Sequence, residues 1–312
     1  MNKKGIAKLT IVFLFACIIL GAVFVFLKGN DLQVINVIEK KEIFYPKQIQ
    51  KTESLILNST TTSYFSVFIG NSGESKILAT EKSTERKRIA SITKIISAMV
   101  ITDNLKDDDI IFISKENLTD AGNFGTFKEG EQFYAKDLIK AVLVPSENVA
   151  VRAFAEKVDK EDFDSLMNRK ILIIGMKNSY FSNPSGLDYP PHEFDFNYST
   201  PEDVALAILY IKNNYPDLLA ITTLEKINIC DTSNSNCREL QSTDKLLNSL
   251  DFPFKIVGAK TGDTLRARKN LAMIIEAPEN RGVIINVIID SVDHFADMKK
   301  LTNWVVDSYI WE

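Results

Sequence analysis

A nearly unbroken apolar stretch, from Leu9 to Leu27, follows three lysines near the N-terminus of the chain. A helix of this length would span roughly 28 Å at about 1.5 Å per residue, close to the thickness of a bilayer's hydrocarbon core. No Ala-x-Ala-like cleavage site precedes Lys28, so the pattern favours an uncleaved transmembrane anchor over a signal peptide. The lysines indicate a cytoplasmic tail over 1–8, with everything after the anchor outside the cell membrane.

Beyond this anchor, the pattern divides the chain into a stalk and one large domain. Residues 28–58 are mixed and charged, typical of a stalk, and a globular domain is expected over 59–312. Short apolar runs predict strands at 64–69, 76–79, 255–261, 270–275 and 283–289, and helical spacing predicts helices at 91–101, within 135–176, at 201–211 and at 295–310. This order predicts an α+β fold, an antiparallel sheet flanked by helices with a helical subdomain.

Composition narrows the function classes. The net charge of −4 at pH 7 argues against a nucleic-acid surface. Two histidines and three cysteines in 312 residues offer no metal-ligand constellation, so neither a metal nor a cofactor is expected. Cys230 and Cys237 bracket a polar loop. Outside the cytoplasm such a pair favours a disulfide that closes a hairpin, and the alternative is two free thiols.

Three short motifs in a fixed order carry the candidate chemistry. They are Ser91–Lys94 (Ser-Ile-Thr-Lys), Ser146–Asn148 (Ser-Glu-Asn) and Lys260–Gly262 (Lys-Thr-Gly). A second Ser-x-x-Lys sequence, Ser242–Lys245, lies in a polar stretch without partner motifs behind it, whereas Ser91 precedes an apolar run that can form a buried helix. This three-part signature is shared by serine acyl-transfer enzymes, the class A β-lactamases and the penicillin-binding proteins.

The first motif has the residues that an acyl-enzyme needs. A serine hydroxyl is a weak nucleophile at neutral pH and requires an adjacent base. Lys94 follows Ser91 by three residues on the same helix face, so a lysine of lowered pKa can take the serine proton. Lys260 is expected to supply the positive charge that lowers this pKa, and the N–H of Ser91 to form half of an oxyanion hole.

The other two motifs predict proton transfer and substrate contacts. Ser146 offers a hydroxyl relay for the proton, and the amide of Asn148 can orient a peptide. Lys260, Thr261 and Gly262 are predicted on a strand whose edge pairs with an extended peptide. At that edge a glycine lets the two backbones approach closely. Together with the first motif they form one candidate site for acyl transfer.

Further sequence features extend from about Tyr64 to the C-terminus. They are Gly130-Glu131, Asp137-Leu138, Met167-Asn168, the Asn-Pro-Ser-Gly-Leu-Asp segment Asn183–Asp188, Ser199-Thr200 with Asp203, and Asp263-Thr264. With these features the chain resembles the low-molecular-mass penicillin-binding proteins, the serine-type D-alanyl-D-alanine carboxypeptidases. The resemblance implies a β-lactamase/transpeptidase-like fold with the site in a cleft. It also implies D-Ala-D-Ala stem peptides of peptidoglycan as substrates, β-lactams as covalent inhibitors, and acylation of Ser91.

Three departures from the family pattern lie at the expected site. Glu147 stands where relatives usually have a small residue, and Asp263, whose N–H would be the second oxyanion donor, replaces an uncharged residue or histidine. His294 falls where relatives carry an arginine that binds the substrate carboxylate, so binding is expected to depend on a histidine titrating near about pH 6.5. The alternative functions are a D,D-endopeptidase, a β-lactamase, and a catalytically weak relative that binds peptidoglycan.

Overall fold

The computed structural model describes residues 24–28, 31–35, 43–49, 54–119, 126–159, 162–188 and 196–312. The chain divides into two compact units, Met1–Ile43 and Phe44–Glu312. In the first unit, β1 (Phe24–Lys28) pairs antiparallel with β2 (Asp31–Ile35), so the last residues of the predicted anchor belong to a strand. The predicted tail and the rest of that anchor lie outside the described residues. Within the described residues, no helix is both long and apolar enough to span a membrane.

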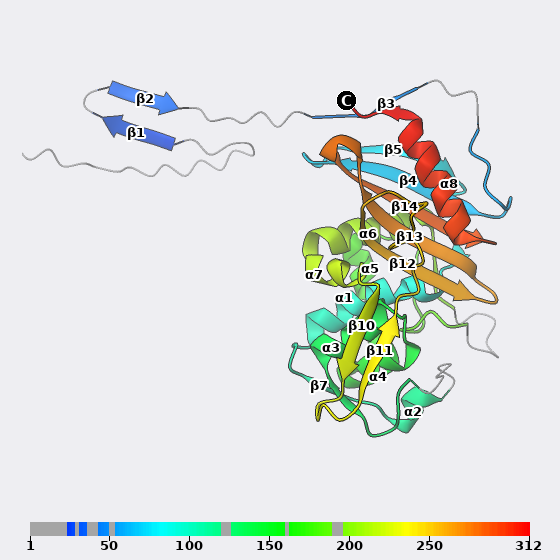
Figure 1. Cartoon of the computed structure of the whole chain (residues 1–312). Helices are drawn as coiled ribbons and strands as arrows, with labels where there is room; N and C mark the ends of the chain where they lie inside the picture. The colour runs from blue at the N-terminus through cyan, green and yellow to red at the C-terminus, as the bar shows by residue number, and fades with distance from the viewer. Residues whose placement is uncertain are drawn as a thin grey trace, which may run out of the picture. The chain divides into compact units, whose positions relative to one another are not determined.

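A five-stranded antiparallel sheet forms the centre of the second unit (Figure 1). Its strand order is β12-β13-β14-β4-β5, so the hairpin formed early in this unit completes a sheet made mostly by its last third. The strands are β4 (Ser63–Gly70), β5 (Ser75–Glu81), β12 (Ile256–Thr264), β13 (Arg268–Glu276) and β14 (Gly282–Ser291). The prediction of an α+β fold around an antiparallel sheet is confirmed. Because β12 is an edge strand, the Lys-Thr-Gly motif lies at the border of the sheet.

One face of the sheet is covered by α8 (His294–Asp307), the helix predicted at the C-terminal end (Figure 1). Every second residue of β13, namely Leu271, Met273 and Ile275, belongs to the same fully buried cluster as Leu301 of α8. The period of two in the strand and the apolar stripe of the helix therefore meet as their patterns predict. Burial of each such side chain contributes about 1.5–3 kcal/mol.

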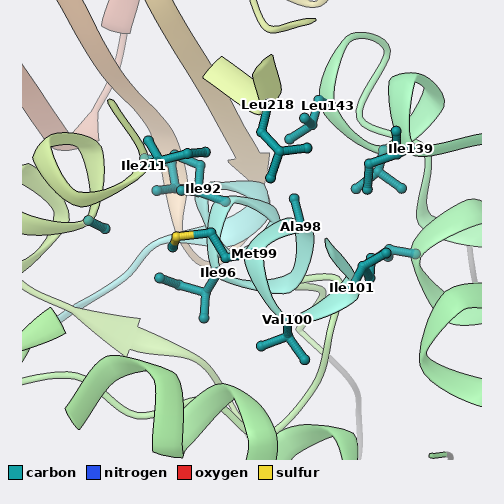
Figure 2. Packing of buried hydrophobic residues seen from close by; sticks show 14 of the residues in the cluster. Ile92, Ile96, Ala98, Met99, Val100, Ile101, Ile139, Leu143, Ile211 and Leu218 are labelled. Carbon is teal, nitrogen blue, oxygen red and sulfur yellow. The ribbon is translucent and has the colours of Figure 1, made fainter. Parts of the chain in front are cut away.

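A second hydrophobic cluster joins the opposite face of the sheet to α1 (Lys94–Asn104) and α6 (Pro201–Asn214). Figure 2 shows Ile96, Met99 and neighbouring side chains packed around α1. This helix is apolar on nearly all sides and almost entirely buried, as a central helix must be. The last residue of the serine motif, Lys94, therefore begins a helix that is buried over most of its length.

The remaining elements form short hairpins and a helical subdomain. They are β6 (Lys87–Arg88), η1 (Ala90–Thr93), β7 (Ile110–Phe112), α2 (Lys115–Leu118), β8 (Gln132–Tyr134), α3 (Ala135–Leu143), α4 (Asn148–Asp159), α5 (Phe163–Ile174), β9 (Tyr198–Ser199), α7 (Pro216–Ile221), β10 (Lys226–Cys230), β11 (Cys237–Gln241) and η2 (Pro278–Asn280). Cys230 and Cys237 form a disulfide where β10 and β11 meet the loop between them.

The folded domain begins closer to the N-terminus than the sequence predicts. β3 (Lys47–Gln48) pairs with β15 (Tyr309–Ile310), and the Phe44 ring lies 5.9 Å from that of the buried Phe68. Lys76 also donates a hydrogen bond across 2.6 Å to the Pro46 carbonyl. The expectation that a separate stalk reaches residue 58 is therefore corrected, because the compact unit begins at Phe44.

Candidate active site

Ser91 lies in the 3-10 turn η1, directly before α1 begins at Lys94. The preceding residue, Ala90, has a φ of 47°, a left-handed conformation that costs a non-glycine residue about 1–2 kcal/mol. Local strain of this kind persists where surrounding contacts hold it, as they do at active sites. The buried helix predicted after Ser91 is present, but the serine precedes its first α-helical turn.

The side chain of Lys94 is fully buried, and its Nζ has three oxygen neighbours. These are Oγ of Ser91 at 2.8 Å, Oδ1 of Asn148 at 2.7 Å and the carbonyl oxygen of Ser185 at 3.0 Å. Asn148 and Ser185 present acceptors, whereas the hydroxyl of Ser91 can also donate. A neutral amine has two N–H donors and one lone pair, so this set of neighbours suits a lysine that accepts the serine proton.

Electrostatics favour this neutral form. Burial lowers the pKa of Lys94 well below its usual value, and the nearby charge of Lys260 lowers it further. Glu147 acts in the opposite direction and raises this pKa. Burial raises the pKa of the Glu147 carboxyl itself, against the opposing influence of Thr126 and Lys94. The residue that departs from the family pattern in this motif thus acts on the candidate base.

Ser146 and Lys260 form a second hydrogen-bonded pair, with 2.8 Å between Oγ and Nζ. Ser146 lies between α3 and α4 with a φ of 66°, and Lys260 is also hydrogen-bonded to the carbonyl of Thr261 at 3.0 Å. Burial lowers the pKa of Lys260 to about 7, and Asp244 partly counteracts this. A lysine with this pKa can both hold a charge and exchange a proton near neutrality.

The structure gives a role to the segment Asn183–Asp188, for which the sequence indicated none. The carbonyl of Ser185 accepts the hydrogen bond from Lys94, and Oδ1 of Asn183 accepts bonds from the N–H groups of Ser185 and Gly186. Gly186 has a φ of 79°, and a Cβ there would overlap the carbonyl oxygen of Ala90. The loop therefore packs directly against the serine turn and completes the shell around the candidate base.

Asp188 ties this loop to two other parts of the site. Its carboxylate lies 3.0 Å from the guanidinium of Arg88, which precedes the serine turn, and accepts a hydrogen bond across 2.5 Å from the hydroxyl of Thr264. Thr264 is the last residue of β12, two positions after the Lys-Thr-Gly motif. One carboxylate thus links the loop, the start of the serine turn and the edge strand.

Gly262 has a packing role that the sequence did not indicate. The sequence predicts that its missing side chain makes room for substrate backbone. A Cβ at Gly262 would also lie 2.6 Å from the carbonyl oxygen of Ile89 and 3.2 Å from the backbone nitrogen of Ile92. Gly262 is therefore needed so that the edge strand can pack against the turn that carries Ser91.

The second Ser-x-x-Lys sequence, Ser242–Lys245, borders the site without forming a nucleophile pair. The hydroxyl of Thr243 lies 2.5 Å from that of Thr261, so this segment holds the third motif in place. Thr243, Lys245 and Thr261 line the same cleft as Ser91. No feature of the sequence indicates this contact, because it joins two residues that neither periodicity nor a motif relates.

The residues of the three motifs meet at a cleft of about 960 Å³. It extends from Ser91 past Thr261 to the first turns of α8 and to the loop that contains Asp251. Lys299 of α8 and Asp251 form an ion pair at its far end, across 2.5 Å. Such a volume is that of a site for a small molecule or a short peptide.

His294 and Asp263 also line this cleft, as the resemblance implied. The His294 ring stacks on Phe295 with 4.0 Å between centroids, and its two nitrogens are buried without hydrogen-bond partners among the described residues. Burial, reinforced by the charge of Lys269, lowers the pKa of His294 to about 4. The expectation that this histidine titrates near pH 6.5 is therefore wrong, because desolvation keeps it neutral well below that pH.

Residues 58–293 match a protein family described as D-alanyl-D-alanine carboxypeptidase. The chain is 29% identical over 224 residues to a D-alanyl-D-alanine endopeptidase of Pseudomonas aeruginosa, with 70% of this chain and 69% of that protein covered. It is 28% identical over 244 residues to the D-alanyl-D-alanine carboxypeptidase DacC of Escherichia coli, with 73% of this chain and 58% of that protein covered.

Solved structures share this fold. A D-alanyl-D-alanine carboxypeptidase from Mycobacterium tuberculosis superposes with a TM-score of 0.69 at 22% identity, covering 82% of this chain and 95% of that one. Penicillin-binding protein D2 from Listeria monocytogenes, in its ampicillin-bound form, gives a TM-score of 0.67 at 23% identity and covers 80% and 98% of the two chains. Because the family match covers residues 58–293 and the geometry of the site agrees with it, the chain belongs to the D-alanyl-D-alanine carboxypeptidase family of serine-type peptidases.

Proposed function

We propose that this protein is a serine D-alanyl-D-alanine carboxypeptidase that trims peptidoglycan stem peptides through an acyl-enzyme on Ser91. The observation that carries the proposal is the environment of Lys94. Its Nζ lies 2.8 Å from the serine oxygen and also contacts acceptors on Asn148 and Ser185. Burial favours the neutral amine, so the lysine can act as the base that a serine nucleophile requires.

The reaction follows from these positions. Oγ of Ser91 attacks the carbonyl carbon of the penultimate D-alanine while its proton passes to Lys94. The N–H groups of Ser91 and Asp263 stabilise the oxyanion. When the tetrahedral intermediate collapses, the C–N bond breaks and the departing D-alanine receives the proton held by Lys94 through the hydroxyl of Ser146, which is also hydrogen-bonded to Lys260. Water then attacks the ester carbonyl, Lys94 takes its proton and passes it to the Ser91 oxygen as the ester bond breaks, and the free serine is restored.

The relatives supply the support for β-lactams as inhibitors. Penicillin-binding protein D2 of Listeria monocytogenes is known in ampicillin-bound and cefotaxime-bound forms. The family match and the pairing of Ser91 with Lys94 support the same covalent capture here, with the ring-opened drug as an ester of Ser91.

Replacement of Lys94 tests the proposed base. Lys94→Arg keeps a long basic side chain but one that stays charged and cannot accept a proton, so release of D-alanine from a peptide ending in D-Ala-D-Ala should fall by about 100-fold or more. The matched control is Lys177→Arg, at an exposed position after α5, which should release D-alanine at the wild-type rate. Equal rates for Lys94→Arg and the wild type would contradict the proposal.

A second candidate function, D,D-endopeptidase, is favoured by the extent of the cleft. The cleft continues beyond Thr261 to Lys245, Asp251 and Lys299, farther than a single departing D-alanine requires. The P. aeruginosa relative is named as an endopeptidase. Cleavage rates for a cross-linked peptide dimer and for a linear pentapeptide, compared at equal concentration, decide between the two functions.

We also propose that the protein is anchored in the cell membrane with its enzyme domain outside. The support is the apolar stretch Leu9–Leu27 behind the N-terminal lysines. Protease added to intact spheroplasts should then remove the domain and leave a membrane-bound N-terminal fragment. A mature protein that begins after Lys28, or one that resists external protease, would contradict this topology.

A further inference from the structure

Two lysines are buried in this active site, and the proposed reaction requires opposite charge states of them. Lys94 is fully buried and Lys260 is 1% exposed. Lys94 must be neutral to take the proton of Ser91, whereas Lys260 must be charged to act on Ser146 and the substrate. Like charges at short range disfavour one another, so negative charge near each lysine determines which of them keeps its proton.

Glu147 lies in the chain between the two residues that contact the active-site lysines, and its charge acts on Lys94. Its two neighbours in the chain hold the two lysines: Asn148 accepts from Lys94 at 2.7 Å and Ser146 from Lys260 at 2.8 Å. The backbone N–H of Glu147 donates to the Ala141 carbonyl at 2.9 Å, which fixes this short connection at the end of α3. The backbone of Glu147 is therefore fixed beside both lysines, and its side chain bonds to Thr126 while its charge acts on Lys94.

Asp244 has the corresponding position beside Lys260. Its neighbour Thr243 is hydrogen-bonded to Thr261, the residue that follows Lys260, so the two segments run against each other at this point. Asp244 is 8% exposed, and one of its oxygens accepts from the Leu246 N–H at 2.9 Å. The other oxygen is buried without a hydrogen-bond partner among the described residues, a costly state for a carboxylate unless a cation lies nearby.

We propose that Glu147 and Asp244 are positioning residues that divide the charge between the active-site lysines: Glu147 controls Lys94, and Asp244 controls Lys260. The inference rests on the proposed function, because it assigns the two lysines different tasks in one acyl transfer. The charged groups that face the cluster are few. Lys94 is faced by Lys260 and Glu147, Lys260 by Asp244, and Glu147 additionally by Arg238 of β11.

Neutral replacements of the two carboxylates should act on opposite sides of the pH profile. Loss of a negative charge lowers the pKa of the lysine that it faces. With Glu147→Gln, Lys94 becomes neutral at lower pH. The acid limb of the pH–rate profile therefore shifts to lower pH, and activity at low pH increases. With Asp244→Asn, Lys260 loses its proton at lower pH. The alkaline limb of the pH–rate profile therefore shifts to lower pH, and activity at high pH decreases. These limbs report the coupled pair rather than isolated residues.

The test is the second-order rate constant for acylation of Ser91 by a fluorescent penicillin, measured against pH with the full-length protein in detergent. Each limb should move by about one pH unit, equivalent to about a tenfold rate change at a fixed pH on that limb. Glu147→Asp keeps the charge and should keep the wild-type acid limb. Glu239→Gln, which removes an exposed carboxylate paired with Lys226, makes the same change in net charge and should move neither limb.

The outcomes separate this inference from the function on which it depends. Limbs that stay in place in both variants, or that move equally in Glu239→Gln, overturn the assignment while acylation itself supports the proposed function. Absence of wild-type acylation at every pH overturns the proposed function instead. Thermal unfolding establishes that each variant is folded. If Glu147→Gln or Asp244→Asn does not fold, Glu147→Ser or Asp244→Ser takes its place. Each serine variant removes the same charge and should give the same shift.

Discussion

Lys260 and Ser146 are 114 residues apart in the chain, yet their Nζ and Oγ atoms lie 2.8 Å from each other. Lys260 belongs to the edge strand β12, whereas Ser146 lies between α3 and α4 in the helical subdomain. The site therefore exists only where the sheet border and the helices meet. Changes that loosen this junction should lower activity even when no reacting group is altered.

Asp188 offers a direct test of that junction. Asp188→Asn should lower the free energy of unfolding by about 1–3 kcal/mol, because it leaves the partly buried Arg88 without its anionic partner. Acylation by penicillin should slow in parallel, since the serine turn and β12 lose their shared tie. The control is Asp162→Asn, whose ion pair with Arg169 is about half exposed, so its loss should change the stability little. Similar losses in both variants would contradict the assigned role.

Substitutions of two glycines distinguish an effect on the active site from an effect on backbone stability alone. Gly262→Ala should reduce the acylation rate strongly, because the added methyl would press against the carbonyl of Ile89 and displace the serine turn. Gly73→Ala, in the turn between β4 and β5, meets no atom within 4 Å but has a φ of 88°. It should cost about 1 kcal/mol of stability without slowing acylation. Denaturant unfolding and acylation kinetics on both variants test this contrast, which a normal acylation rate for Gly262→Ala would refute.

The sequence predicted those features that depend on local pattern or on a recurring motif. Short apolar runs identified all five strands of the central sheet, and the continuous apolar run after Lys94 identified the buried α1. The three motifs pointed to residues that the structure brings together around Ser91. A fixed motif carries this information because its chemistry requires particular side chains at particular places along the chain.

Features that depend on distant contacts could not be predicted in the same way. The Ser185 group that contacts Lys94 is a backbone carbonyl, which any residue possesses, so the sequence offers no signal for it. Asp244 lies in a polar, motif-like segment that reaches the site only through the contact of Thr243 with Thr261. The start of the domain at Phe44 depends on a strand pair of two residues, too short to leave a periodic pattern. The lowered pKa of His294 arises from burial, which emerges only from the complete fold.

His294 should make the protein less stable in mild acid. Its pKa is lowered from 6.5 to about 4 in the folded state, so between these values the unfolded chain binds more protons at this residue than the folded one. Stability therefore falls as pH decreases through this range, by up to roughly 3 kcal/mol from this group. Denaturant unfolding at pH values across the range should show a smaller loss for His294→Gln than for the wild type. Parallel curves for the two proteins would contradict the lowered pKa, because they would mean that His294 titrates alike in the folded and unfolded states.

The most direct test of the account is the identity of the residue that penicillin acylates. Mass spectrometry of the protein after incubation with penicillin should show one added drug molecule, and peptide mapping should place it on Ser91, beside the base Lys94. The adduct should be lost in Ser91→Ala and kept in Ser242→Ala, which alters the second Ser-x-x-Lys sequence. An adduct that persists in Ser91→Ala, or that maps to Ser242, would contradict the assignment of the nucleophile and with it the proposed function.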